Sequence, residues 1–265
     1  MKKLIARSFD RSSDSYSQQA YVQAEMAQQL CAVLPQESHF HNVLEFGVGT
    51  GYLSERFFLR CQCERYTIND FSGSMLESCH RKLRSFLSDS VKQKCALITL
   101  AGDIEKLAPT LSESYDLILS SATLQWIEDP FVLLDQLYAH LTPDGQMLIG
   151  TFGEDNLREI KALSGKGLAY PCLRQFEEWA ERAGAKFTCY AAYQKKLFFD
   201  SPLAVLRHLK ETGVTYLPTQ AEPLFLSRKG LTHFCDEYIA RYSKGSRVGL
   251  TYHPLLLRFY KACSN

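Results

Sequence analysis

The sequence has little that would place this chain in a membrane or in an oxidising compartment. No stretch of its 265 residues approaches the length of an apolar membrane span, and the start turns polar soon after Lys2 and Lys3, without the apolar core of a signal peptide. The nine cysteines form no C-x-x-C pair, and their odd number does not suit a disulfide framework. These absences predict a soluble, cytoplasmic protein with reduced thiols.

Signatures of metal and nucleoside-triphosphate chemistry are also missing. The sequence contains no H-E-x-x-H, no clustered set of histidines and cysteines, and no P-loop. Lone histidines such as His208 and His253 are more often structural than catalytic. We therefore expect no metal site.

The net charge of +1 favours neither nucleic acid nor an anionic membrane as a partner, but the charge is unevenly distributed. Residues 1–150 carry 13 basic and 18 acidic residues, whereas residues 151–265 carry 17 basic and 11 acidic residues. This imbalance is either chance scatter over a solvated surface or a sign that the C-terminal part faces an acidic partner.

Short apolar runs alternate with amphipathic stretches from residue 41 onward, which predicts an α/β fold with a parallel sheet and helices on both faces. Two long strands, 185–199 and 246–260, are suited to an antiparallel hairpin at the sheet edge. The other expected strands are 42–47, 64–69, 95–100, 115–121 and 145–152. The expected helices are 17–34, 72–87, the stretch from Asp129 to a stop at "TPDG" (142–145), 172–184, 201–212 and 231–243.

A glycine-rich turn follows the first of these strands. The stretch "EFGVGTG", residues 45–51, has the spacing E-x-G-x-G-x-G, in which the third glycine comes one place earlier than in the dinucleotide fingerprint G-x-G-x-x-G. Glycines here leave backbone N–H groups at a helix start open to a ligand, because no Cβ blocks its approach. The spacing therefore departs from that of a pyrophosphate-binding turn, but glycine turns are common, and the spacing alone does not identify a ligand.

Polar residues follow the next three strands, where a doubly wound sheet brings strand ends to one crevice. Asp70 ends the second strand and could accept hydrogen bonds from ribose hydroxyls, while Asp103 beside Ile104 suits an adenine amino group and ring. The fourth strand ends in "SSATLQWIEDP", which contains Ser120 and Gln125. In isolation, an Asp in such a loop is more often a turn residue or a helix cap.

Together these motifs resemble the class I S-adenosylmethionine-dependent methyltransferases. The resemblance implies a Rossmann-like fold: a seven-stranded, mostly parallel sheet with an antiparallel last strand, an N-terminal helix, and a helical cap inserted between the last two strands. It implies one domain, with a core at 40–200 and 245–262, an N-terminal cap at 10–38 and an insertion at 201–245. It also implies S-adenosylmethionine as cofactor, held by Glu45, Gly47, Gly49, Gly51, Asp70, Phe71, Met75, Asp103, Ile104, Ser120 and Gln125.

The flanking segments resemble one group, the malonyl-acyl carrier protein (ACP) O-methyltransferases of biotin synthesis (the BioC family). The likeness covers nearly the whole chain and is carried by "SFDRSSDSYSQQAYVQAEMAQQL", "AGDIEKL", "GTFGEDNLREI", "GKGLAYP" and "GLTYHPLLLRFYK". It implies methylation of the free carboxylate of malonyl-ACP, the first step towards pimelate. Tyr16, Arg158 and Tyr170, with Lys166, are the candidates to bind that carboxylate.

An acidic ACP would explain the basic C-terminal part. The docking residues would come from Lys195, Lys196, Arg207, Lys210, Arg228, Lys229, Lys244 and Arg247. Two alternatives remain open: a methyltransferase for another small carboxylic acid or a quinone precursor, and an S-adenosylmethionine-binding protein without turnover.

Overall fold

The computed structural model describes residues 20–88, 94–212 and 228–261, which form two compact units. The core unit comprises the described residues of Val22–Thr151, Leu173–Ala191 and Leu255–Asn265. The appended unit comprises those of Met1–Tyr21, Phe152–Cys172 and Ala192–Pro254. Within the described ranges, no helix has the length and apolar character needed to cross a bilayer.

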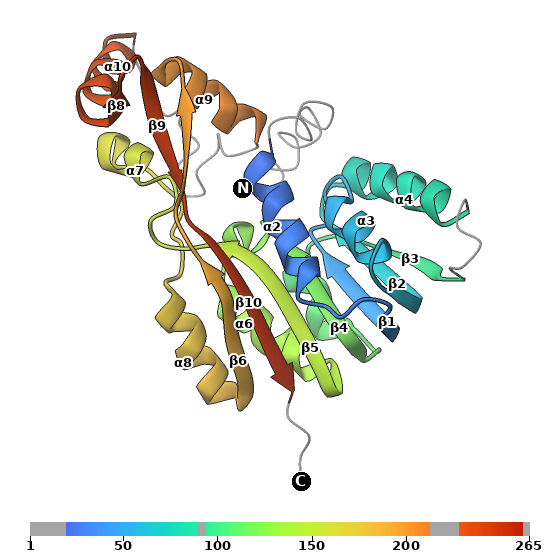
Figure 1. The fold of residues 1–265 in the computed structure, drawn as a ribbon. Helices are drawn as coiled ribbons and strands as arrows, with labels where there is room; N and C mark the ends of the chain where they lie inside the picture. Colours follow the sequence, from blue (N-terminus) through green and yellow to red (C-terminus); the bar gives the residue numbers. More distant parts are fainter. Residues whose placement is uncertain (1–19, 89–93, 213–227, 262–265) are drawn as a thin grey trace. The chain divides into compact units, whose positions relative to one another are not determined.

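The core unit is built on a seven-stranded sheet in the order β3-β2-β1-β4-β5-β10-β6. Neighbours among the first five strands pair in parallel, and β10 runs opposite to β5 (Figure 1), so the expected class of sheet is confirmed. The strands are β1 (His39–Phe46), β2 (Gln62–Asp70), β3 (Ala96–Ala101), β4 (Tyr115–Ser121), β5 (Leu141–Phe152), β6 (Ala185–Ala192) and β10 (Pro254–Lys261).

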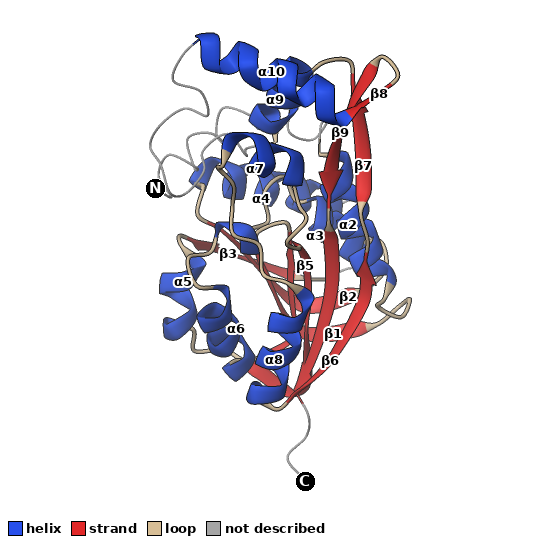
Figure 2. Ribbon diagram, turned by 90° about the vertical axis from the view of Figure 1, so that its left-hand side faces the viewer, coloured by secondary structure: helices blue, strands red, loops and turns tan. Residues whose placement is uncertain are grey.

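Helices cover both faces of this sheet (Figure 2). One face carries α2 (Tyr21–Ala32), α3 (Tyr52–Phe58) and α4 (Gly73–Ser88). The other carries α5 (Ile104–Leu107), α6 (Pro130–Ala139) and α8 (Leu173–Ala183), with short 3₁₀ turns at η1 (Ala108–Thr110) and η2 (Leu124–Trp126). Because both faces are covered, the central strands β1 and β4 are buried along most of their length.

Local sequence signals set the start of α6 but not its end. The helix begins after Asp129, as expected: Asp129 accepts hydrogen bonds from Phe131 N and Val132 N at 3.1 Å, and Pro130 occupies the first turn. The expected stop at "TPDG" is wrong, because the helix ends at Ala139 and β5 already begins at Leu141. The four residues lie in a bulge of β5, where the register with β4 shifts.

The two long strands expected at 185–199 and 246–260 are each divided. β6 ends at Ala192 and β7 (Lys195–Phe199) belongs to another sheet, as does β9 (Arg247–Tyr252) on the other side of His253 from β10. Pro254 has no N–H to donate, and a proline restricts the residue before it, so the ladder is interrupted there. The expected pairing at the sheet edge is found in both parts: the edge strand β6 lies beside β10 in the core sheet, and β7 pairs with β9 in antiparallel register.

The appended unit contains its own three-stranded sheet, in the order β7-β9-β8 with β8 at Ser243–Lys244. Both pairings are antiparallel. Its helices are α7 (Arg158–Ser164), α9 (Pro202–Glu211) and α10 (Arg228–Tyr242), which confirms the helices expected at 201–212 and 231–243. The insertion between β6 and β10 is thus a small mixed module and not purely helical.

A buried histidine links α9 to this small sheet. His208 is 4% exposed, its Nε2 lies 2.8 Å from Tyr252 Oη, and its ring packs on Phe199. Burial lowers the pKa of His208 to about 4. The unfolded chain therefore binds the proton more readily than the folded protein between about pH 6.5 and pH 4, and stability falls as the pH drops through that window.

We expect His208→Gln, which can keep a hydrogen bond to Tyr252, to flatten this acid dependence. The measurement is the urea midpoint between pH 4.5 and pH 7, with His39→Gln at an exposed position as the matched control. An unchanged slope in the His208 variant would show that other groups cause the acid sensitivity.

Candidate functional site

The glycine turn joins β1 to α3 in a backbone form that suits glycine. Gly47, Gly49 and Gly51 have φ angles of +68°, +50° and +76°, in the left-handed region. A residue with a Cβ is strained there by roughly 1–2 kcal/mol. The turn therefore needs glycine for its path, whatever it binds.

The surroundings of the three glycines differ. A Cβ on Gly47 would lie 2.1 Å from Thr123 Oγ1, and one on Gly51 would lie 2.8 Å from Cys79 Sγ. A Cβ on Gly49 would meet no atom within 4 Å. The outer glycines thus allow close packing, whereas Gly49 borders open space.

Asp70 connects the end of β2 to this turn. Its Oδ2 accepts a hydrogen bond from Gly49 N at 2.9 Å, and its Oδ1 accepts one from Ser72 N at 2.9 Å. Ser72 Oγ in turn accepts the N–H of Met75 at 3.2 Å and so caps the start of α4. Asp70 is 6% exposed. Its two hydrogen bonds hold the glycine turn and the start of α4 in a fixed geometry.

The end of β3 lies beside the end of β2, since Gly102 N donates to Asp70 O at 3.0 Å. Asp103 is partly exposed and caps α5 by accepting the N–H of Glu105 at 3.3 Å, and Ile104 behind it is 4% exposed. The structure therefore brings Asp103 and Asp70 to neighbouring strand ends, while giving Asp103 a capping role as well.

The end of β4 contributes polar groups on the other side of β1. Ser120 Oγ donates to Phe46 O at 2.9 Å, and Gln125 Nε2 donates to Ala122 O at 2.7 Å. The Oε1 atom of Gln125 is buried and has no hydrogen-bond partner among the described residues. Such an atom is an acceptor that a ligand N–H can satisfy.

Thr123 is a site residue that sequence reasoning missed. Its hydroxyl donates towards Gly47 O at 3.3 Å and Ser121 O at 3.2 Å, and its side chain occupies the space beside Gly47. It belongs to the "SSATLQW" segment, but a small polar residue in a loop carries no signal of this contact.

Glu45 precedes the turn and is fully enclosed. It is 1% exposed, and its Oε2 accepts hydrogen bonds from Ser54 Oγ at 2.6 Å and from the Tyr66 hydroxyl. Burial raises the pKa of the Glu45 carboxyl to about 7, with the negative charge of Asp70 adding to the effect. In the structure the carboxyl thus ties β1 to α3 and β2.

This raised pKa predicts a pH dependence of stability. Between about pH 4.5 and pH 7 the folded protein binds the Glu45 proton more readily than the unfolded chain, so stability falls as the pH rises through that range. We expect Glu45→Gln to remove this loss, because glutamine does not titrate. As the pH rises, the variant should become more stable than the parent protein by about 1.4 kcal/mol for each unit by which the pKa of Glu45 differs between the folded and unfolded states. Urea unfolding at pH 5, 6, 7 and 8 measures it; a constant difference between the two proteins would contradict the prediction.

The expected substrate residues fall in other parts of the chain. Tyr16 lies outside the described residues. Arg158 is the first residue of α7 and is exposed. Tyr170 is half-buried, with its ring 6.4 Å from that of Phe152 and its hydroxyl bonded to the side chain of Asn156. Burial raises the pKa of Tyr170, which keeps its hydroxyl protonated.

Around Tyr170 the appended unit has a polar network that the sequence did not reveal. Asn156 Oδ1 accepts the N–H of His253 at 3.2 Å, and His253 Nδ1 accepts the N–H of Asp155 at 3.3 Å. Gln194 Nε2 donates to Asp155 Oδ2 at 2.7 Å. Since the paired residues are 39 to 98 positions apart along the chain, only the fold brings them together.

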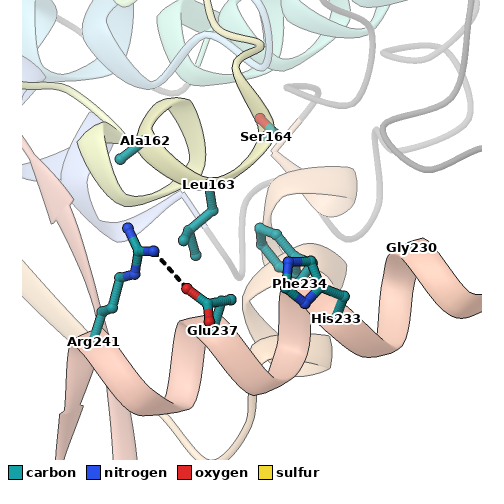
Figure 3. A pocket seen from close by; sticks show the side chains of 8 residues that line it. All are labelled: Ala162, Leu163, Ser164, Gly230, His233, Phe234, Glu237 and Arg241. Atoms are coloured by element: carbon teal, nitrogen blue, oxygen red, sulfur yellow. Dashed lines mark ion pairs between the residues drawn. The ribbon is translucent and has the colours of Figure 1, made fainter.

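A shallow cavity of about 250 Å³ lies between α7 and α10 (Figure 3). It has an apolar floor that includes Leu163 and Phe234, and its rim carries the ion pair between Glu237 and Arg241. None of the residues expected from the sequence to bind cofactor or substrate lines it. Within the described ranges, no group of three or more acidic, histidine or cysteine side chains is arranged to hold a metal ion.

Comparison with known proteins gives matches at two levels. A family model described as a methyltransferase domain matches residues 44–147. Over 97% of this chain, the sequence is 35% identical to the malonyl-[acyl-carrier protein] O-methyltransferase of Haemophilus ducreyi and 31% identical to that of Acinetobacter baylyi. In both cases the match spans 95% of the relative.

Solved structures match the fold at low sequence identity. The YcgJ protein of Bacillus subtilis has a TM-score of 0.61 at 14% identity, covering 90% of this chain and 98% of its own. A SAM-dependent methyltransferase from Thermotoga maritima has a TM-score of 0.54 at 16% identity, covering 97% of this chain and 99% of its own. At such identities the likeness concerns the fold alone.

Proposed function

Because the chain belongs to the family of malonyl-[acyl-carrier protein] O-methyltransferases, we propose that it methylates the free carboxylate of malonyl-ACP with S-adenosylmethionine, at the start of pimeloyl synthesis for biotin. The observation that carries this proposal is the extent of the similarity. It covers 97% of the chain, including the segments beyond residues 44–147, the range of the general methyltransferase model. A cytoplasmic location, where carrier-bound malonyl is made, is part of the proposal.

The residues of the glycine turn and the adjoining strand ends fit the cofactor. Gly49 borders open space, and the buried Oε1 of Gln125 has no partner among the described residues, so the site offers both room and an acceptor. We assign cofactor binding to Gly47, Gly49, Gly51, Asp70, Phe71, Met75, Asp103, Ile104, Ser120 and Gln125, with Glu45 beneath the turn. When bound, S-adenosylmethionine supplies an electrophilic methyl group on a sulfonium.

The chain's part in the reaction is mainly positioning. A malonyl carboxylate is already ionised at pH 7, so no side chain has to remove a proton from it. The protein must orient one carboxylate oxygen and keep water from solvating it. Too strong an ion pair would weaken the nucleophile, and a neutral hydroxyl such as that of Tyr170 holds the carboxylate without neutralising it. Arg158 and Lys166 are the candidates to attract the substrate.

We expect Tyr170→Phe to raise KM for malonyl-ACP and to lower kcat/KM by roughly 10- to 100-fold, the loss of one hydrogen bond to a charged group. The ring and its packing on Phe152 remain, so the free energy of unfolding should fall only by the lost hydrogen bond to Asn156, about 1 kcal/mol. The matched control is Tyr190→Phe, a 42% exposed tyrosine bonded to Arg258, which should keep full activity. Equal kinetics for both variants would exclude Tyr170 from the substrate site.

The proposal is tested by incubating the protein with S-adenosylmethionine and malonyl-ACP and measuring the intact carrier by mass spectrometry. We expect a gain of one methyl group that is lost on mild ester hydrolysis. Product from a free small acid, but none from malonyl-ACP, would favour the alternative function, a methyltransferase for small acids or quinone precursors. Cofactor binding without product from any acceptor would favour a non-catalytic binding protein.

A further inference from the structure

Basic side chains share one face of the small sheet in the appended unit. Lys244 pairs with Arg247, and Phe198 pairs with Gly249, in antiparallel register. Directly paired residues point to the same face, as do residues two apart along a strand. Lys196 precedes Phe198 by two places and Arg247 precedes Gly249 by two, so both lie on the face that carries Lys244.

Side-chain contacts agree with this register. Lys244 Nζ lies 5.7 Å from the centroid of the Phe198 ring, and Arg247 donates a hydrogen bond to Phe198 O. A Cβ on Gly249 would lie 2.2 Å from Lys196 Cε, so the lysine stem lies across the glycine. The three basic residues are exposed and surround a half-buried aromatic ring.

The other face of the sheet is covered. Phe199 and Tyr252 point to that face, and both rings pack on His208 of α9. On the basic side, Asp200 is an acidic neighbour, with its Oδ1 3.5 Å from Arg247 Nε. The buried carboxylate of Glu159 also meets this face, because Thr251, which pairs with Lys196, donates its hydroxyl to Glu159 Oε1. Three exposed basic side chains against one exposed and one buried carboxylate leave this face with a net positive charge.

We propose that this basic sheet face, Lys196, Lys244 and Arg247 around Phe198, is the docking surface for the acidic carrier protein that bears the malonyl group. The proposal rests on the proposed function and narrows the eight basic residues singled out in the sequence to three that share a face. Exposed cations in a cluster attract an acidic partner and accelerate its encounter, and a partly exposed aromatic ring at the centre provides an apolar contact.

The test is a double charge reversal, Lys196→Glu with Lys244→Glu. We expect KM for malonyl-ACP to rise about ten-fold at low ionic strength and the increase to shrink in high salt, because exposed charges are screened. The turnover of a malonyl thioester of N-acetylcysteamine, which has no protein part, should stay within two-fold of the parent enzyme. Equal losses of activity on both substrates would contradict the proposal that the carrier docks on this face.

The matched control is Arg207→Glu with Lys210→Glu, which makes the same charge change on exposed positions of α9. It should alter KM for malonyl-ACP by less than two-fold. An effect as large as that of the sheet variant would show that the overall charge of the protein, and not this sheet face, determines KM. If the parent protein methylates neither substrate, the proposed function fails. Calorimetric binding of the carrier to the same variants would still decide where it docks.

A separate observation concerns two thiols at the edge of the core sheet. Cys63 in β2 and Cys95, which directly precedes β3, have their sulfur atoms 3.4 Å apart. A disulfide needs about 2.05 Å, so a small shift suffices. Cys63 is 4% exposed and Cys95 is more accessible. The hydrogen bond from Cys63 lowers the pKa of the Cys95 thiol, which favours Cys95 as the reacting thiolate.

We propose that Cys63 and Cys95 form a reversible disulfide when the protein meets a peroxide. The Cys95 thiolate attacks one peroxide oxygen, giving a sulfenic acid and a hydroxide that takes up a proton to leave as water. The Cys63 sulfur then attacks the sulfenic sulfur, loses its proton, and releases the second water. The bond would join the edge strand β3 to β2 across the segment that contains α4.

Treatment of the whole protein with one equivalent of hydrogen peroxide should lower the intact mass by about 2 Da per chain, the mass of the two hydrogen atoms lost when one disulfide forms. Peptide mapping should place the bond between Cys63 and Cys95, dithiothreitol should reverse it, and Tm should rise by roughly 5 °C before reduction. Cys95→Ser should abolish the mass loss. Overoxidised Cys95 without a cross-link, or a bond between other cysteines, would overturn the proposal.

Discussion

Asp70→Asn is expected to weaken S-adenosylmethionine binding by roughly 30- to 100-fold, corresponding to about 2–3 kcal/mol. Both carboxylate oxygens of Asp70 accept backbone hydrogen bonds, from Gly49 N and Ser72 N. An asparagine of the same shape must point its NH₂ group at one of these N–H donors. One chain segment would therefore separate from the side chain, and the glycine turn would lose its fixed geometry.

Calorimetric titration with S-adenosylmethionine and with S-adenosylhomocysteine measures this effect directly, without the methyl acceptor. The matched control is Asp103→Asn, at the neighbouring strand end, where the side chain is partly exposed and caps α5. An asparagine is itself a good cap, so we expect a smaller loss, under ten-fold. Equal losses of affinity at both positions would mean that Asp70 acts only through contact with the ligand and not by holding the glycine turn. An affinity of Asp70→Asn within three-fold of the parent protein would exclude Asp70 from the site.

Gly49→Ala is expected to reduce cofactor affinity strongly. The free energy of unfolding should fall only by the backbone strain of a residue with a Cβ at this φ angle, roughly 1–2 kcal/mol. The added methyl group meets no protein atom within 4 Å, so it projects into the space proposed for the cofactor. Gly47→Ala should behave differently. Its methyl group would overlap Thr123, whose hydroxyl would have to give up its bonds to Gly47 O and Ser121 O.

The pair separates a packing glycine from a ligand-facing glycine in the same turn. For Gly47→Ala we expect a loss of about 2–4 kcal/mol in the free energy of unfolding, from backbone strain and the displaced Thr123. Urea unfolding gives the stability of each variant, and calorimetry with S-adenosylhomocysteine gives the affinity. Normal affinity in Gly49→Ala would show that the cofactor does not approach this side of the turn.

Local patterns predicted the elements that depend on local interactions. α6 begins after Asp129, as the sequence predicts, since a capping side chain and the preset φ angle of Pro130 act on their own helix start. The end of β5 at Phe152 also matches the apolar run. The break between β9 and β10 at His253 does not follow from the apolar periodicity, which runs on through this segment; it depends on Pro254, which lacks an N–H donor.

Tertiary structure assigned different roles to residues that look alike in the sequence. Gly47 and Gly49 have equivalent places in the pattern, yet one packs on Thr123 and the other borders open space. Glu45 and Asp70 are both acidic, but Glu45 is enclosed by Ser54 and Tyr66 hydroxyls, whereas Asp70 holds the glycine turn. Each distinction depends on a neighbour more than eight residues away along the chain.

The sequence by itself determined the class of fold, the position of the glycine turn and the order of acidic residues at successive strand ends, because these follow from periodicity and backbone preference within short segments. Only the tertiary structure decided which basic residues share a face and which thiols meet. The basic sheet face joins Lys196 to Arg247 and the thiol pair joins Cys63 to Cys95. Strand register sets such contacts, and register is fixed by packing between distant segments.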